Sequence, residues 1–240
     1  MTSVICAEPP AVYSIGIVSD TIPFEFDRQR RLTDIGTLIL SRFLAMRPGS
    51  LHIENVESDR DFQRRDIDLI WHRAIRGWER TTVEIKCDAH AGDDEALIRS
   101  ARHPYYARRT DNFALETVSN DVSGSPGWVF ASEADVLLYY FAAIPRTIDE
   151  IEEWWALGEE YLLATLGIVS DRLYVIDLPE LRRWFEAVQG NYREVAAQND
   201  TYRTLSRLVP CDDVVEAIRH CHVVTDVYRA VTIAFGLPRY

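Results

Sequence analysis

The sequence predicts a mixed α/β domain, in which a mixed sheet is flanked by helices. Three observations favour this class: one long amphipathic segment near the N-terminus, two short apolar segments rich in β-branched residues behind it, and a strand followed by a helix further along the chain. The chain has 240 residues, 47% of them hydrophobic, which is enough to bury one sizeable core. No internal repeat and no linker rich in glycine or serine divides it.

The first helix is expected over residues 23–47. Its apolar residues recur at helical spacing, and Pro48 and Gly49 supply the stop; the recurring residues are Leu32, Ile35, Ile39 and Phe43. The apolar residues within 66–71 predict a buried strand, and residues 81–87 predict a second one. In the second strand Glu84 and Lys86 share one face, because side chains two residues apart point to the same side of a strand.

The remaining elements are expected in the following order. Residues 92–109 are expected to be partly helical, 112–118 to form a third strand of the same sheet, and 132–140 to form a helix that runs into the apolar residues 141–144. A strand at 172–177 and a helix from Pro179 to Val188 follow. The acidic residues within 146–170 indicate an inserted helix or helix pair. Residues 1–190 would thus form the core, and 191–240 a helical C-terminal extension packed on it.

The charge balance limits the class of partner. A formal net charge of -12 argues against a protein that coats nucleic acid by bulk attraction, so any contact with DNA must come from a local patch of cations. The N-terminal residues lack a basic segment and a long apolar run, which favours a soluble cytoplasmic protein without a membrane partner. The four cysteines show no paired spacing that would indicate a disulfide framework.

The usage of basic residues singles out one position. Of the 26 basic residues, Lys86 is the single lysine and the others are arginines. Arginine serves for surface charge and ion pairs, but it does not replace a compact ammonium whose protons point in several directions. Lys86 is therefore a candidate for chemistry, unless it is a chance survivor of a drift towards arginine.

The neighbours of Lys86 complete a candidate metal site. Hydrolysis of a phosphodiester needs a hard divalent cation that neutralises charge and activates water. Asp68 and Glu84 on neighbouring strands would hold Mg²⁺ or Mn²⁺, and the backbone carbonyl of Ile85 would complete the ligand set. Lys86 would lie beside the water that attacks the phosphate. The catalytic residues expected on this basis are Asp68, Glu84 and Lys86.

Asp68 and the Glu84-Ile85-Lys86 segment sixteen residues later resemble the PD-(D/E)XK nuclease superfamily. The resemblance covers about residues 25–190 and implies a restriction-endonuclease-like core, magnesium-dependent cleavage of DNA, metal-binding carboxylates and a lysine beside the attacking water. The chain lacks the Pro-Asp step of that family, and Asp66 remains an alternative ligand. The family often carries an acidic residue on its first helix, for which Asp34 and Glu25 are candidates; Asp34 is included in the expected catalytic set.

DNA contacts are expected from the basic segment that follows the second strand, through Arg99, Arg102, Arg108 and Arg109. A second basic turn, formed by Arg28, Arg30 and Arg31, would touch backbone phosphates beside the site. A solvated surface explains both clusters as well. Cutting of both strands would favour a two-fold homodimer. Two alternatives remain: a non-catalytic DNA-binding or scaffolding protein of the same fold, and a nuclease acting on RNA.

Overall fold

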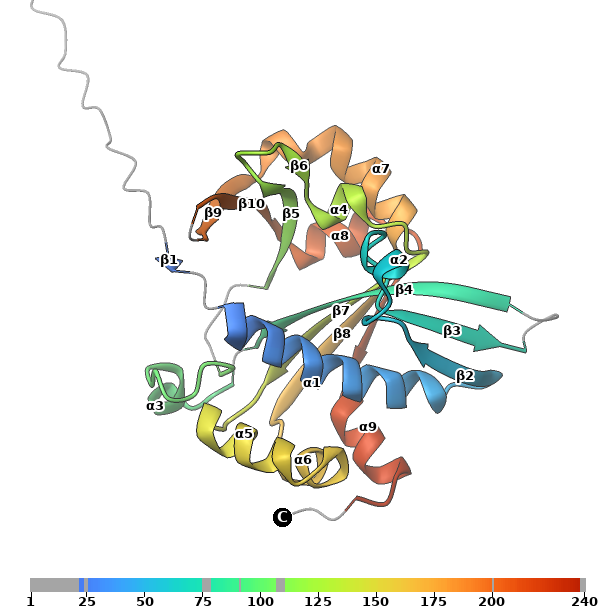
Figure 1. Ribbon diagram of the computed structural model, residues 1–240, viewed down its shortest axis with the longest axis vertical. Helices are drawn as coiled ribbons and strands as arrows, with labels where there is room; N and C mark the ends of the chain where they lie inside the picture. Colours follow the sequence, from blue (N-terminus) through green and yellow to red (C-terminus); the bar gives the residue numbers. More distant parts are fainter. Residues whose placement is uncertain are drawn as a thin grey trace, which may run out of the picture.

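A computed structural model describes residues 22–23, 26–74, 79–90, 92–106, 111–199 and 201–237 of the chain. Two sheets and the helices around them form a mixed α/β fold (Figure 1). The larger sheet contains, in spatial order, β11 (Cys221–Thr225), β8 (Ser170–Asp177), β7 (Val136–Ala143), β4 (Glu79–Ala89), β3 (Leu69–Arg73) and β2 (Ser50–Asn55). Its strands β4 and β7 are parallel, and the other neighbours are antiparallel. The mixed sheet that the sequence predicts is therefore confirmed.

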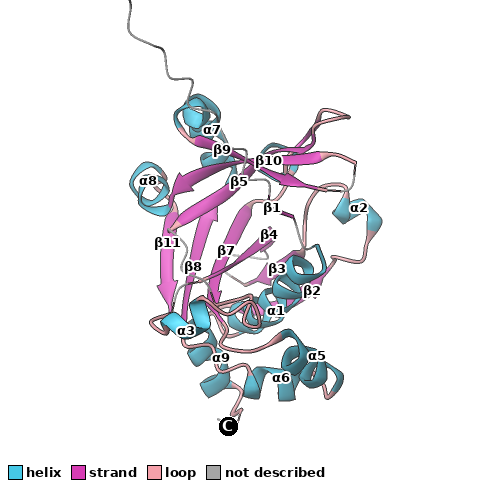
Figure 2. Ribbon diagram, turned by 90° about the vertical axis from the view of Figure 1, so that its left-hand side faces the viewer, coloured by secondary structure: helices cyan, strands magenta, loops and turns pink. Residues whose placement is uncertain are grey.

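The smaller sheet lies on one side of the larger one, together with three helices (Figures 1 and 2). Its strands, in spatial order, are β1 (Ile22–Pro23), β9 (Arg193–Gln198), β10 (Arg203–Pro210), β5 (Asn112–Asn120) and β6 (Ser125–Pro126). The helices on this side are α4 (Trp128–Ala131), α7 (Leu178–Val188) and α8 (Cys211–Ala217), and the short helix η1 (Gln189–Asn191) follows α7. They enclose a core that contains Phe113, Tyr139, Phe141 and Tyr174.

The opposite side of the larger sheet is covered by α1 (Phe26–Ala45), α5 (Ile148–Ala156), α6 (Glu159–Thr165) and α9 (Val227–Ala234) (Figure 1). The predicted apolar residues of α1 are all buried in this second core. Gly36 lets α1 lie directly on β4, because a Cβ at this position would stand 2.0 Å from the Cys87 Sγ. The acidic segment forms α5 and α6, which is the helix pair that its composition predicts. α2 (Arg60–Gln63) and α3 (Glu95–Ile98) are short.

The prediction of a helix at residues 132–140 is wrong, because residues 136–140 belong to the central strand β7. Its run of apolar residues reflects burial on both faces: Leu138 and Tyr140 belong to the core under α1, whereas Tyr139 and Phe141 belong to the other core. The strand beside β4 is β7, and not the strand 112–118 that was expected in the same sheet. That strand exists as β5, but it lies in the smaller sheet.

Two further expectations need correction. The segment 191–240 is not a purely helical extension, because it supplies β9 and β10 to the smaller sheet and β11 to the larger one. The strand expected at 66–71 begins only at Leu69, since Asp66 has a φ of 48° and lies in a turn. None of the helices in the described part of the chain is long and apolar enough to cross a lipid bilayer.

Candidate active site

Successive side chains of β4 point alternately to the two sides of the larger sheet, where they meet different environments. Val83, Ile85 and Cys87 pack under α1, as the sequence predicts. Glu84 and Lys86 point to the opposite side, where the smaller sheet and α4 lie, and the Lys86 Nζ lies 5.4 Å from the centre of the Trp128 ring. Lys86 forms an ion pair with Glu84 Oε1. The lone lysine is thus held between a carboxylate and an aromatic ring.

Asp68 is fixed at the point where β3 and β4 separate. Its backbone N–H donates to the carbonyl of Val83 (2.9 Å), and its Oδ2 accepts the N–H of Ile85 at 2.6 Å. Val83 pairs with Leu69, the first residue of β3, so the edge of β4 beyond Val83 faces the Asp68 carboxylate instead of a strand. The N–H and C=O of one strand residue point to the same edge, which places the Ile85 carbonyl on the side of Asp68.

Asp68, Glu84 and Lys86 line a pocket of about 170 Å³. Its lining residues are Glu57, Gln63, Asp66, Ile67, Asp68, Glu84 and Lys86. Four carboxylates therefore surround one ammonium, and the structure brings the predicted Asp68, Glu84 and Lys86 together with the alternative ligand Asp66. Gln63 comes from α2, whose first turn is capped by the carboxylate of Asp59. An excess of carboxylates in a small pocket favours a bound cation.

Burial dominates the electrostatics of Glu84, whose side chain is 1% exposed. This burial raises its pKa from 4.5 to about 8, although the charge of Lys86 opposes the shift. Burial likewise raises the pKa of Asp68, again against the effect of Lys86 and of the Ile85 N–H. Burial of Lys86 lowers the pKa of its ammonium, but Glu84 and Asp68 outweigh it, and the net pKa is raised. Lys86 is thus held in its charged form.

One buried oxygen shows that the residues present fit a hard cation. Glu84 Oε2 has no hydrogen-bond partner among the described residues, although Oε1 of the same carboxylate is paired with Lys86. Buried polar atoms in folded proteins nearly always have a partner. Carboxylate and carbonyl oxygens are the ligands that Mg²⁺ and Mn²⁺ prefer, and Glu84 Oε2, Asp68 and the Ile85 carbonyl are oxygens of these types.

The pKa of Glu84 predicts how stability depends on pH in excess chelator. Because burial raises the pKa of Glu84 to about 8 in the folded protein, against 4.5 in the unfolded chain, the free energy of unfolding should fall as the pH rises from 5 to 8. One such proton contributes at most about 1.4 kcal/mol per pH unit. Glu84→Gln should make the fall smaller. Thermal melting at steps of pH measures this, and parallel curves for the two proteins would contradict it.

Two carboxylates near the site were not expected in it. Glu57 lines the pocket from the loop behind β2, and burial raises its pKa, as does the charge of Asp68. Glu116 of β5 lies within electrostatic reach of Lys86, and its carboxylate accepts the N–H of Trp128. Glycine at position 127 lets the start of α4 lie close to the backbone of Glu116, because a Cβ there would stand 2.2 Å from the Glu116 carbonyl oxygen. Only the packing of the smaller sheet on the larger one brings Glu116 here.

The acidic residue that was expected on the first helix, Asp34, does not lie in the acidic pocket. It lines an adjacent cleft, where it forms an ion pair with Arg31 at 3.2 Å. Its charge still contributes to the raised pKa of Glu57, which lines both hollows. Glu57 therefore lies beside Asp68 and Glu84 in the pocket where Asp34 was expected. The other candidate, Glu25, lies outside the described residues.

Of the predicted DNA-binding arginines, the structure describes Arg99 and Arg102. Arg99 is exposed and forms an ion pair with Glu95, and Arg102 is exposed in the turn behind α3. Arg108 and Arg109 lie outside the described residues. In both ribbon views α3 lies apart from α2 (Figures 1 and 2), which contributes Gln63 to the pocket. Arg30 of α1 acts on the acidic pocket, because its charge lowers the pKa of the Glu57 carboxylate.

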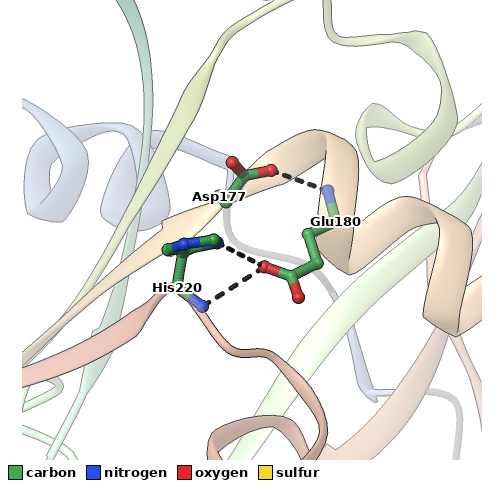
Figure 3. Close-up of side chains that lie close together, drawn as sticks. All are labelled: Asp177, Glu180 and His220. Atoms are coloured by element: carbon green, nitrogen blue, oxygen red, sulfur yellow. Dashed lines mark hydrogen bonds and ion pairs between the residues drawn. The ribbon is translucent and has the colours of Figure 1, made fainter.

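A second group of possible ligands lies elsewhere, at the start of α7 (Figure 3). Asp177 caps this helix by accepting the N–H of Glu180 at 2.8 Å. The Glu180 carboxylate accepts the backbone N–H groups of Arg219 and His220, and it lies 3.1 Å from the His220 Nδ1. Its oxygens are thus used to join the turn before β11 to α7, which is a structural role.

No family model, no curated protein and no solved structure matches this chain.

Proposed function

We propose that this protein is a metal-dependent DNA endonuclease that hydrolyses phosphodiester bonds. The observation that carries the proposal is the environment of Glu84: one carboxylate oxygen pairs with the lone lysine, and the other is buried without a partner among the described residues. Asp68 and the Ile85 carbonyl lie at the same opening between β3 and β4. This arrangement supports the resemblance to PD-(D/E)XK nucleases and a restriction-endonuclease-like arrangement of the core.

The residues of the pocket have separate tasks in hydrolysis. Bound Mg²⁺ or Mn²⁺ would neutralise charge on the phosphate and lower the pKa of a coordinated water. Asp68 and Glu84 would hold the cation, and the N–H of Ile85 fixes the Asp68 carboxylate by donating to its Oδ2. Lys86 donates to the attacking water or to a phosphate oxygen. In the reaction, the water loses a proton to solvent as its oxygen forms a bond to phosphorus, the bond from phosphorus to the leaving oxygen breaks, and the leaving oxygen takes up a proton from a solvent water.

DNA would reach this pocket past the N-terminal turn of α1. Arg28 and Arg30 are exposed there, and the charge of Arg30 acts on Glu57, which lines the pocket. Such arginines supply contacts to phosphates without reading sequence. Arg99 and Arg102, which follow α3 and lie apart from the pocket, would contact DNA at a distance from the cleaved bond. A two-fold homodimer would place a second pocket on the other strand.

A cleavage assay with varied metals tests the proposal. We expect cutting of DNA with Mg²⁺ or Mn²⁺, and binding with little cutting with Ca²⁺, because the looser coordination of calcium positions the water poorly. The protein is incubated with single-stranded, duplex and branched DNA and with RNA, with each cation and with chelator. Cutting in excess chelator at the full rate would refute the metal mechanism. Binding without cutting under all conditions would favour a non-catalytic protein, and cutting of RNA alone a ribonuclease.

A further inference from the structure

The cleft beside the acidic pocket is the larger of the two hollows. It has a volume of about 520 Å³ and lies between α1, the end of β2 and the helix pair α5 and α6. Its volume falls within the usual range of sites for small organic ligands. Glu57 lines both the cleft and the acidic pocket, so the two are neighbours. The cleft and the acidic pocket thus meet at Glu57, just beyond the end of β2.

The lining of the cleft fits a flat, neutral, polar group. Trp155 and Leu38 supply aromatic and apolar surface, and Ser41 and Asn55 supply polar side chains. The guanidinium of Arg31 lies 4.5 Å from the centre of the Trp155 ring and is neutralised by two carboxylates, those of Glu152 and Asp34. Arg42 likewise faces Glu159 at 3.6 Å. Because both arginines already have acidic partners, the cleft does not favour a phosphate.

Thr37 gives a second, independent indication of a ligand. It lines the cleft from α1, it is 5% exposed, and its Oγ1 has no hydrogen-bond partner within the described part of the chain. A buried hydroxyl without a partner destabilises a fold, and replacing it with a methyl group would remove that cost. By contrast, Thr33 one turn earlier donates to the carbonyl of Gln29 and does not line the cleft. The Thr37 hydroxyl is thus available to a group bound in the cleft.

We infer that the cleft holds the base of an unpaired deoxynucleotide whose phosphate lies in the acidic pocket. A nucleobase is flat and neutral, it stacks on tryptophan and on guanidinium planes, and its edge hydrogen-bonds to hydroxyl and amide groups. The preferred substrate is then single-stranded DNA, or a strand with an extruded base, since unpairing a duplex base costs free energy. This inference rests on the proposed function, because the acidic pocket must receive the phosphate.

Binding, measured separately from cutting, tests the inference. Fluorescence anisotropy in Ca²⁺ compares a labelled oligo(dT) strand with a strand of the same length made of abasic nucleotides. Thr37→Val should weaken binding of oligo(dT) by about three- to tenfold, and Trp155→Ala by about tenfold or more. Both variants should bind the abasic strand as the parent does. Thr33→Val and Trp154→Ala are the matched controls and should bind oligo(dT) like the parent. A melting temperature of Thr37→Val at or above that of the parent excludes unfolding as the cause.

The outcomes separate this inference from the nuclease proposal. Equal affinity of the parent for oligo(dT) and for the abasic strand would overturn the base site, as would unchanged affinity of both cleft variants. Either result would leave metal-dependent cutting as it stands. Weaker binding of oligo(dT) by Thr37→Val, without any cutting in Mg²⁺ or Mn²⁺, would support the base site and refute the nuclease.

Discussion

Glu84→Gln and Asp68→Asn should each reduce metal-dependent cutting of DNA below detection. Glu84→Gln replaces a carboxylate that is 1% exposed, and it removes the charge from a buried oxygen that has no partner among the described residues. Asp68→Asn removes the charge that faces Ile85 and Lys86. A hard divalent cation binds weakly to neutral amides when carboxylates are lost. Single-turnover cleavage in saturating Mg²⁺ measures the effect, and isothermal titration calorimetry measures the affinity for Mn²⁺.

The matched control for this prediction lies on the same strand. Glu79 belongs to β4, but its side chain is 45% exposed and forms an ion pair with Arg73, away from the pocket. Glu79→Gln should therefore cut DNA at the parent rate and bind Mn²⁺ with the parent affinity, because exposed ion pairs contribute little. If Glu84→Gln or Asp68→Asn also retains the parent rate, that carboxylate does not belong to the catalytic site.

Lys86→Arg should lower the cleavage rate by about a hundredfold or more, although it conserves the charge. The guanidinium is planar and its donors point in fixed directions, so it does not replace an ammonium that orients a water. Its fork can also engage both oxygens of the Glu84 carboxylate, which would take Oε2 away from a cation. The fold should persist, because the positive charge beside Glu84 and Asp68 is retained. Single-turnover cleavage and thermal melting on the same preparation provide the measurement.

The reciprocal exchange on β4 is the control. Arg80 is exposed, and its guanidinium lies 5.6 Å from the centre of the Phe62 ring, outside the acidic pocket. Arg80→Lys should therefore cut DNA at the parent rate. If Lys86→Arg does so as well, the single lysine is an accident of composition, and the main argument for a catalytic ammonium fails.

Local periodicity was sufficient for the elements that bury one continuous face. The apolar residues of α1 and the alternation of β4 are visible in the sequence, and the structure confirms both. Periodicity was not sufficient for β7, because a segment buried on both faces loses its alternation and resembles a buried helix. It also failed for residues 191–240, whose short strands pair with partners far away in the sequence.

By itself, the sequence determined that Glu84 and Lys86 share a face and that the lone lysine lies among acids, because both follow from spacing and composition along one strand. Tertiary structure decided which other carboxylates join them. It placed Glu57 at the pocket, brought Glu116 close through the second sheet, and moved Asp34 to the adjacent cleft. It also left the Oε2 of Glu84 without a partner among the described residues. These features depend on how separate elements pack, and no local pattern of side chains records the distance between segments that meet only when the chain folds.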